Sequence, residues 1–272
     1  MAGRELPESC AACIVPDSTL GAPPHVPGAR EAWDISLPEL QRQVDSEDTR
    51  QVREKVINIW EAMGFWKQIA HGKPLHELPE IRLGAYPAFE AEAVRWLAWY
   101  AHYHHPRNYV EIGIRWGFSA SIVAVGCPGV EIYGIDAWQK DRGPPPSVWN
   151  APHSIQASSA GLAVGWYDIR HYTRFITGEP RTAVQRLFSG TAAPQAVDLA
   201  YVRTDPAYGD ATENALQIAD HLASGGMLVL LGSRPSEVEP VTLAIRQRYP
   251  DYFYLTTNFG LGAVILAAIL QQ

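Results

Sequence analysis

The chain has 272 residues, of which 47% are hydrophobic, and it carries a formal net charge of −7. A chain of this length and apolar content can form one large α/β domain with an N-terminal appendage. The acidic balance excludes a protein that binds nucleic acid mainly through phosphate contacts, and it favours a small neutral or cationic substrate.

The cysteine count and the hydropathy pattern narrow the cellular context. Three cysteines are too few for a disulfide framework, and the first residues lack the basic-then-apolar pattern of a secretion signal. Cys10 and Cys13 have no further soft ligands near them in the sequence, so a zinc or redox role is not favoured. No apolar stretch reaches the roughly 20 residues that span a bilayer. We therefore expect a cytoplasmic protein with a small-molecule substrate and no nucleic-acid or membrane partner, and a homodimer is compatible with these features.

The N-terminal third is predicted to hold an arm and a cap. Residues 1–30 are rich in Pro, Gly, Ala and Ser and lack an apolar period, which is typical of a flexible arm. Residues 31–85 are expected to form an N-terminal helical cap. Within them, residues 36–70 have apolar side chains at three- and four-residue steps, with Ser36 or Asp45 as the expected helix cap.

Residues 86–272 are expected to form the main domain, which begins with a helix at 87–103. The aromatic side chains of this helix either line a pocket or pack in the core, and their spacing fits both. Strands then alternate with helices, which predicts an α/β fold with a doubly wound, mostly parallel, seven-stranded sheet and an antiparallel last strand. The predicted strands are 109–112, 131–136, 173–179, 197–202, 227–231, 252–256 and 262–267; the later predicted helices are 184–188, 212–222 and 238–248, with a turn at Gly225 and Gly226.

A long segment without a strand pattern follows the second strand. Residues 139–159 contain few apolar side chains and a Gly-Pro-Pro-Pro run, and loops of this length are often lids or binding elements. Trp149 and His153 are the large ring-bearing residues of this loop. Each is therefore a candidate substrate contact. A helix is expected at 160–169.

Residues 109–119 and 131–138 contain the most informative motif. The pattern predicts a strand, a glycine turn, a helix and a second strand that ends in an acid. Gly113 and Gly117 let the backbone approach a ligand, and the next helix offers N–H groups at its start. Asp136 lies where a carboxylate can accept both hydroxyls of a ribose. A dinucleotide site would have similar spacing, but Arg115 stands where its second glycine belongs.

This stretch resembles the first motif of class I S-adenosylmethionine-dependent methyltransferases, and more narrowly the branch of small-molecule O-methyltransferases and cephalosporin-hydroxylase-type proteins. The resemblance runs from about Tyr86 to the C-terminus and implies a Rossmann-like methyltransferase domain over 86–272, with S-adenosylmethionine as cofactor. It places Glu111 and Gly113 beside the methionine part and Asp136 on the ribose. The residues that match the motif, or that the resemblance assigns to the cofactor, are Glu111, Ile112, Gly113, Gly117, Ser119, Gly134, Ile135, Asp136 and Trp138, the last near the adenine, and Glu179, expected to meet the adenine amino group.

The part of the family pattern that carries the chemistry is altered. Relatives have Y-I-D-G-D-H-S-Y-E after the fourth strand, whereas Arg203 replaces the first acid here and Pro206 replaces the histidine. Asp205 remains as the candidate base, or else pairs with Arg203 or caps the next helix. Tyr208 and His153 are the alternative bases. The H-D pair that relatives carry after the fifth strand is absent, since Leu231 and Gly232 stand in its place.

These changes shape the expected chemistry. A divalent metal needs several hard oxygen ligands, and one carboxylate alone would bind Mg2+ weakly, so a metal-independent reaction is expected. A metal site stays open as an alternative, because Asp205 with Asp210 or Asn214 would supply two or three oxygens. Arg203 would offer a fixed positive fork to an anionic substrate group, beside Trp149. The resemblance implies a methyltransferase acting on a small molecule, by O-methylation in secondary or sugar metabolism. Two alternatives stay open: a catalytically degenerate binding or regulatory subunit, and an enzyme that uses the same pocket for another reaction.

Overall fold

The computed structural model describes residues 37–62, 88–114, 117–136, 173–190, 193–204, 209–232, 235–252, 254–258 and 264–268. The described helices are α2 Leu37–Val44, α3 Glu47–Ala62, α5 Ala88–His104, α6 Phe118–Gly126, α8 Pro180–Ser189, α9 Ala211–Ala219 and α10 Pro235–Arg248. The described strands are β1 Asn108–Ile112, β2 Glu131–Asp136, β3 Thr173–Thr177, β4 Val197–Arg203, β5 Leu222–Leu231, β6 Tyr254–Asn258 and β7 Val264–Ala268.

The strands form one seven-stranded sheet in the order β3-β2-β1-β4-β5-β7-β6. The first five strands in this order are parallel, and β7 runs antiparallel to both β5 and β6. The chain builds outward from β1 to β3 on one side, then returns to the centre and builds outward through β4 and β5. This reversal creates a switch point between β1 and β4, where open α/β sheets commonly bind their ligands.

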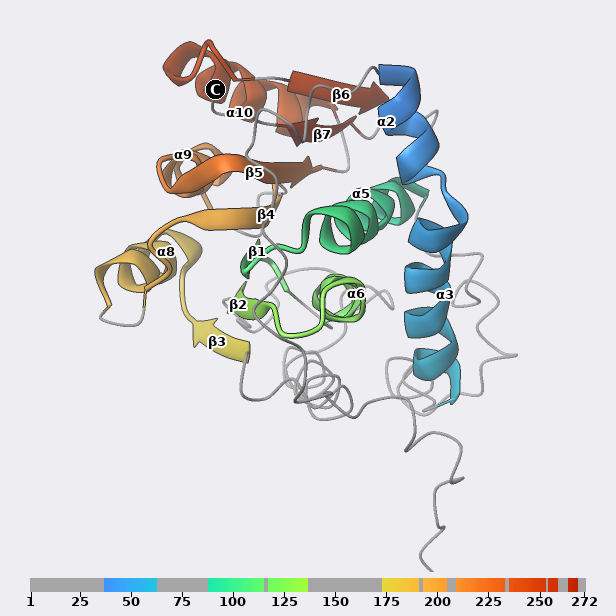
Figure 1. The fold of residues 1–272 in the computed structure, drawn as a ribbon. Helices are drawn as coiled ribbons and strands as arrows, with labels where there is room; N and C mark the ends of the chain where they lie inside the picture. The colour runs from blue at the N-terminus through green and yellow to red at the C-terminus, as the bar shows by residue number, and fades with distance from the viewer. Residues whose placement is uncertain are drawn as a thin grey trace, which may run out of the picture.

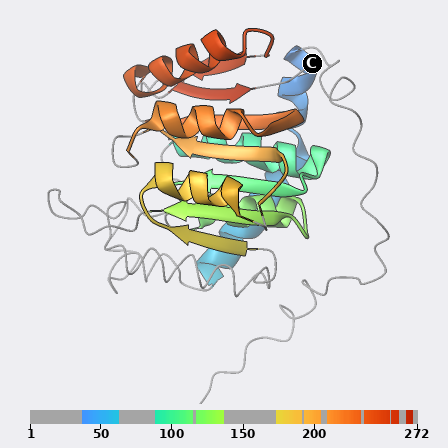
Figure 2. The ribbon, with the colours of Figure 1, turned by 90° about the vertical axis from the view of Figure 1, so that its left-hand side faces the viewer.

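Helices cover both faces of the sheet, as the alternation of the sequence predicts (Figure 1). Helices α8, α9 and α10 lie on one face, and Figure 2 shows them in front of the strands that they connect. Helices α5 and α6 lie on the other face, and α3 packs against both of them as an outer layer. None of the helices described by the structure is long and apolar enough to cross a membrane.

Alternation along the strands divides the core into two apolar clusters. Val110 and Ile112 of β1 join the cluster under α8 to α10, whereas Tyr109 points to the cluster under α5 and α6. Glu111 therefore faces α5 and α6 as well, because side chains two residues apart share a face. Glu111 pairs with Gly134 of β2 and with Tyr201 of β4. The residues two positions further along these strands, Asp136 and Arg203, consequently lie on the same face as Glu111.

The predicted helical segment at 36–70 is two helices in the part that the structure describes. The helix is interrupted at Asp45 and Ser46, which lie between α2 and α3. The Ser46 hydroxyl accepts a hydrogen bond from the Thr49 N–H at 3.2 Å, which caps α3. Asp45 is not the cap; its carboxylate pairs with Arg95 of α5. Ser36 lies outside the described residues.

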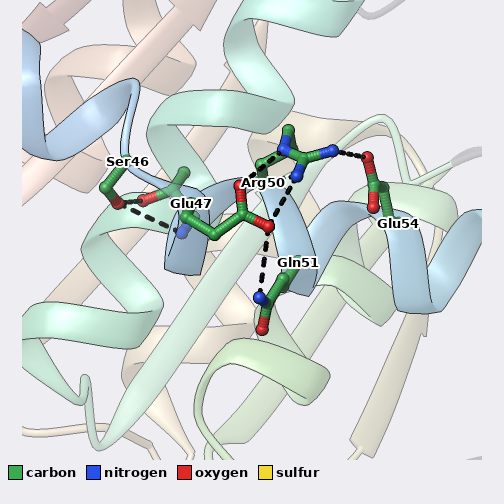
Figure 3. A network of polar contacts seen from close by, with 6 residues as sticks. Ser46, Glu47, Arg50, Gln51 and Glu54 are labelled. Carbon is green, nitrogen blue, oxygen red and sulfur yellow. Dashed lines mark hydrogen bonds and ion pairs between the residues drawn. The ribbon is translucent and has the colours of Figure 1, made fainter.

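An ion-pair network lies on the exposed side of α3, just after this cap. Figure 3 shows Arg50 between Glu47 and Glu54, with Nε···Oε2 at 3.0 Å and Nη1···Oε1 at 2.7 Å. Solvent screens exposed ion pairs at this spacing, so they contribute little to stability, and the network supports the helix rather than a site.

The prediction of a turn at Gly225 and Gly226 is wrong, because β5 runs from Leu222 straight through both glycines. The pairing of β4 with β5 shifts register after Val197, and Gly225 adopts a left-handed φ of 76° at this irregularity. A Cβ on Gly226 would lie only 2.8 Å from the carbonyl oxygen of Val197. The glycines therefore accommodate a bulge and a close backbone approach.

Candidate functional site

The candidate site lies where the carboxyl ends of β1, β2 and β4 meet the start of α6. Three charged residues reach this edge, one from each strand: Glu111, Asp136 and Arg203. All three are buried, with exposed fractions of 0%, 3% and 7%. Buried charges in proteins are paired or functional, so this row is the first place to look for a site.

The turn between β1 and α6 is built on two glycines in left-handed conformation. Gly113 has a φ of 88° and Gly117 a φ of 79°, and a residue with a side chain would be strained at either position. Gly113 N–H donates to the carbonyl of Ile135 at 2.8 Å, which ties the turn to β2. Gly117 precedes α6 and has no side chain with which to cap the helix, which begins at this edge of the sheet.

Gly134, the glycine of the second half of the motif, has a packing reason. A Cβ at this position would collide with the Cδ1 atom of Ile114 and would lie 3.2 Å from Cδ1 of Phe175. The side chain of Ile114, which follows Gly113, therefore packs over β2 at Gly134, and only glycine leaves room for it.

Glu111 is the most deeply buried of the three charged residues and has two neutral donors. The Tyr109 hydroxyl donates to Oε2 at 2.9 Å, and the Ser119 hydroxyl donates to Oε1. Burial, the largest influence, and the charge of Asp136 raise the pKa of Glu111, whereas Ser119, Arg203 and Tyr109 lower it; the net result is a pKa of about 7. Glu111 thus exchanges its proton near neutral pH.

Arg203 points back into the sheet edge. Its Nε donates to the carbonyl of Gly113 at 3.0 Å, and its Cζ lies 5.5 Å from the centre of the Tyr201 ring. The guanidinium therefore contacts the glycine turn and an aromatic face, and its charge acts on Glu111. Its predicted contact with an anionic substrate group stays a prediction, and so does a pairing with Asp205, which lies outside the described residues.

Asp136 ends β2, and its backbone carbonyl accepts a hydrogen bond from Gly178 N–H at 3.1 Å. Its carboxylate lies at the carboxyl edge, on the same face as Glu111. The structure therefore brings together Glu111, Gly113, Gly117, Ser119 and Asp136, all of which the motif assigns to the cofactor. The role of Asp136 on a ribose stays a prediction.

Glu179 has a local role that the sequence analysis missed. Its carboxylate accepts hydrogen bonds from Arg181 N–H at 3.1 Å and from Thr182 N–H at 2.9 Å, which caps α8. The signal was present, because proline is common at the first position of a helix, and Pro180 therefore makes Glu179 the N-cap. The predicted contact of Glu179 with an adenine amino group stays a prediction.

The ends of β4 and β5 are closed against each other. Thr204 donates to the Leu231 carbonyl from its N–H at 2.8 Å and from its hydroxyl at 3.1 Å. A Cβ on Gly232 would lie 2.5 Å from Oγ1 of Thr204 and 2.7 Å from Cγ2 of Val238. No metal-binding side chain therefore fits at the position where relatives carry an acid.

Two further observations concern a metal. Asp210, one of the candidate oxygen donors, caps α9 by accepting from Glu213 N–H at 3.1 Å. Among the residues that the structure describes, no three His, Cys, Asp or Glu side chains lie close enough together to hold a metal ion.

Several predicted site residues lie outside the described ranges. These are Asp205, His153, Tyr208, Trp149 and Trp138. The arm at 1–30, the loop at 139–159 and the helix expected at 160–169 also lie outside them. Their assignments stay predictions.

Two residues of the site were not among the predicted ones. Tyr109 donates to Glu111, and strand alternation was the available signal, since positions 109 and 111 share a face. Thr204 closes the edge between β4 and β5, and its role depends on the pairing with Leu231, for which the sequence holds no local signal.

No protein-family model matches the sequence, and no curated protein matches it significantly. Solved structures do share its architecture. A protein of Staphylococcus aureus assigned as a caffeoyl-CoA O-methyltransferase is 12% identical, with a TM-score of 0.50 over 80% of this chain and 99% of that chain. An O-methyltransferase of Bacillus cereus, solved with S-adenosylhomocysteine, is 14% identical, with a TM-score of 0.49 over 81% of this chain and 91% of that chain. An rRNA methylase of Streptococcus thermophilus is 11% identical, with a TM-score of 0.49 over 69% of this chain and 99% of that chain.

Likeness at this level of identity concerns the fold. The strand order with its antiparallel β7 and the match over four fifths of the chain agree with each other. The chain therefore has the fold of the class I S-adenosylmethionine-dependent methyltransferases.

Proposed function

We propose that this chain is an S-adenosylmethionine-dependent methyltransferase that transfers the methyl group to an oxygen atom of a small-molecule acceptor. The observation that carries the proposal is the pair of buried acids, Glu111 and Asp136, at the carboxyl ends of adjacent strands beside the turn from Gly113 to Gly117. An acid at the end of β2 suits the two hydroxyls of a ribose. A second acid beside the glycine turn suits the positively charged methionine part.

The residues present fit this cofactor. The left-handed glycines allow close backbone approach, and Gly117 leaves the start of α6 without a side-chain cap. When bound, S-adenosylmethionine supplies a methyl group on a sulfonium, an electrophile that needs alignment more than activation.

The protein must then orient the acceptor and remove its proton. Asp205 is the proposed base for the acceptor hydroxyl, with His153 and Tyr208 as alternatives. Trp149 is the proposed acceptor contact. These four residues follow β2 or β4 in the chain, and loops after parallel strands meet at the carboxyl edge where the buried acids lie.

We propose that the transfer needs no metal ion. Arg203 replaces an acid at the end of β4, and Gly232 leaves no room for a ligand at the end of β5. Magnesium prefers several converging oxygen ligands, and a guanidinium opposes its binding by charge repulsion.

The test is calorimetric titration of the purified chain with S-adenosylmethionine and S-adenosylhomocysteine, in Mg2+ and in EDTA. We expect micromolar affinity in both buffers. Asp136→Asn should weaken both ligands by roughly 10- to 100-fold, because a buried charged hydrogen bond is lost. Asp48→Asn, on the exposed face of α3, is the matched control. Failure of the folded protein to bind either ligand would contradict the proposal.

A second candidate is a catalytically degenerate subunit that binds the cofactor and regulates a partner. Two features favour it: Arg203 stands in place of an acid, and the end of β5 is closed at Gly232. In both places the chain lacks a group that the resembling methyltransferases use in catalysis. Mass spectrometry of reactions with hydroxylated, carboxylated and amine acceptors separates the candidates. A methylated product supports the enzyme, whereas tight cofactor binding without any product supports the degenerate subunit.

A further inference from the structure

Three buried charges form a row across the centre of the sheet. Asp136, Glu111 and Arg203 come from the neighbouring strands β2, β1 and β4 and share the face under α5 and α6. Two carboxylates and one guanidinium sum to one negative charge when all three are ionised. Among the described residues, the groups that act on Glu111 are Tyr109 of its own strand, Ser119 of α6, and the other two members of the row, Asp136 and Arg203.

We propose that Arg203 is a positioning residue of the cofactor site: its guanidinium holds the Gly113 carbonyl and offsets the charge of Asp136 on Glu111, so that the site accepts a cationic sulfonium. This inference rests on the proposed function for the identity of the ligand. The contacts of Arg203 itself do not depend on that identity.

Arg203 fixes the position of the glycine turn through a contact between distant parts of the chain. The hydrogen bond from Arg203 Nε to the Gly113 carbonyl measures 3.0 Å and joins residues that are 90 positions apart in the chain. Gly113 is left-handed and carries no side chain, so this bond and the bond from its own N–H to Ile135 hold the turn from both sides. A turn held in this way presents the same backbone to every ligand that enters.

Arg203 also acts on Glu111 through its charge. Burial and the charge of Asp136 both raise the pKa of Glu111, and the charge of Arg203 is one of three influences that lower it. Without that charge, Glu111 would keep its proton to a higher pH. A protonated Glu111 attracts a sulfonium far less than a carboxylate does, whereas the neutral thioether of S-adenosylhomocysteine is less sensitive to the change.

Two substitutions separate the two roles of Arg203, and a third, at Arg107, is the control. Arg203→Gln keeps a donor for the Gly113 carbonyl and removes the charge. Arg203→Lys keeps the charge and loses the planar fork. Arg107→Gln removes an arginine that pairs with Asp198 at the opposite edge of the sheet, with Nη2···Oδ1 at 2.9 Å, and serves as the control.

The first measurement is the titration of the Glu111 carboxyl by carbon-13 NMR in the ligand-free protein. We expect an inflection near the pKa of about 7 in the wild type, the Lys variant and the control. In Arg203→Gln it should move upward by about one pH unit or more, which is the size of shift that one close charge produces. An unchanged inflection in a folded Arg203→Gln protein would overturn the proposal, because a purely structural arginine would not move it.

The second measurement is the affinity for S-adenosylmethionine and S-adenosylhomocysteine between pH 6 and pH 9. In the wild type, the affinity for S-adenosylmethionine relative to that for S-adenosylhomocysteine should rise as the pH increases through the inflection of Glu111. In Arg203→Gln this rise should shift to higher pH. A ratio independent of pH in the wild type overturns the ligand part. If neither ligand binds any variant, the proposed function fails, while the NMR titration still decides the role of Arg203.

Discussion

The side chain of Arg203 donates from Nε to the carbonyl of Gly113 at 3.0 Å and thereby joins the ends of β4 and β1. This contact lies at the switch point of the sheet, where the direction of building reverses. An acid at position 203 could not make it, because a carboxylate accepts and does not donate. Arginine at this position therefore sets the contacts of the edge as well as its charge.

The pH dependence of folding stability should report on Glu111. Its pKa is about 7 in the folded protein and 4.5 as a free group, so between these pH values Glu111 is protonated in the folded state and ionised in the unfolded state. The contribution to stability is full below about 4.5 and is lost as the pH rises through about 7, with a total change of about 3 kcal/mol. Glu111→Gln should remove this component, as measured by denaturant unfolding at pH 5, 6 and 8.

Stability must be compared between wild type and Glu111→Gln, because His104 changes the folding stability with pH in the opposite direction. Burial lowers the pKa of His104 to about 4, so its contribution grows as the pH rises from about 4 toward 6.5. The difference between wild type and Glu111→Gln cancels this effect. Glu239→Gln, exposed on α10, is the control. An identical pH slope in wild type and Glu111→Gln would contradict the burial argument.

Removal of the Tyr109 hydroxyl should raise the pKa of Glu111 further, because that hydroxyl donates to Oε2 at 2.9 Å and favours the ionised form. Tyr109→Phe keeps the ring in the core and deletes only the donor. We expect the carbon-13 titration of Glu111 to shift to higher pH, and the stability at pH 8 to fall by about 1–3 kcal/mol. Tyr133→Phe, whose hydroxyl donates to the exposed Glu131, is the matched control. A shift to lower pH in Tyr109→Phe would reverse the assigned role.

Restoring an acid after the fifth strand should damage the fold without creating a metal site. In Gly232→Asp the new Cβ would come within 2.5 Å of Thr204 Oγ1. Overpacking of this kind typically costs about 1–3 kcal/mol. Unfolding experiments should show this loss, and calorimetry should show no gain in Mg2+ affinity. Gly190→Ala, where the nearest atom would lie 3.4 Å from the new Cβ, should be tolerated better. A stable Gly232→Asp protein that binds Mg2+ tightly would refute the closed-edge argument.

The role of Glu179 can be tested with variants that separate its capping of α8 from its negative charge. Glu179→Ala should lose about 1 kcal/mol of stability because the cap of α8 is removed, whereas Glu179→Asn should lose less. Both variants should bind S-adenosylhomocysteine as the wild type does if the carboxylate serves only the helix. An affinity loss common to both, in excess of the stability change, would instead support the predicted contact with adenine.

Much of the fold could be predicted from local patterns, and so could the glycine turn and the acid at the end of β2 in the candidate site. Alternating apolar runs indicate the strands, left-handed glycines are needed wherever a strand turns sharply into a helix, and an acid at a strand end marks the carboxyl edge. Gly113, Gly117 and Asp136 were found in this way. Their signals are contained in a few neighbouring residues, so no tertiary information was needed.

Other features were decided only by tertiary structure. Which carbonyl Arg203 reaches depends on the pairing of β1 with β4, whose residues are separated by about 90 positions. The raised pKa of Glu111 arises from burial and from the charge of Asp136 on β2, and it is opposed by the charge of Arg203 on β4. Gly232 is closed off by the side chains of Thr204 and Val238. A sequence motif supplies the donors and acceptors, but strand register and burial decide which of them meet, because a hydrogen bond forms only when donor and acceptor lie about 3 Å apart and burial sets how strongly charges interact.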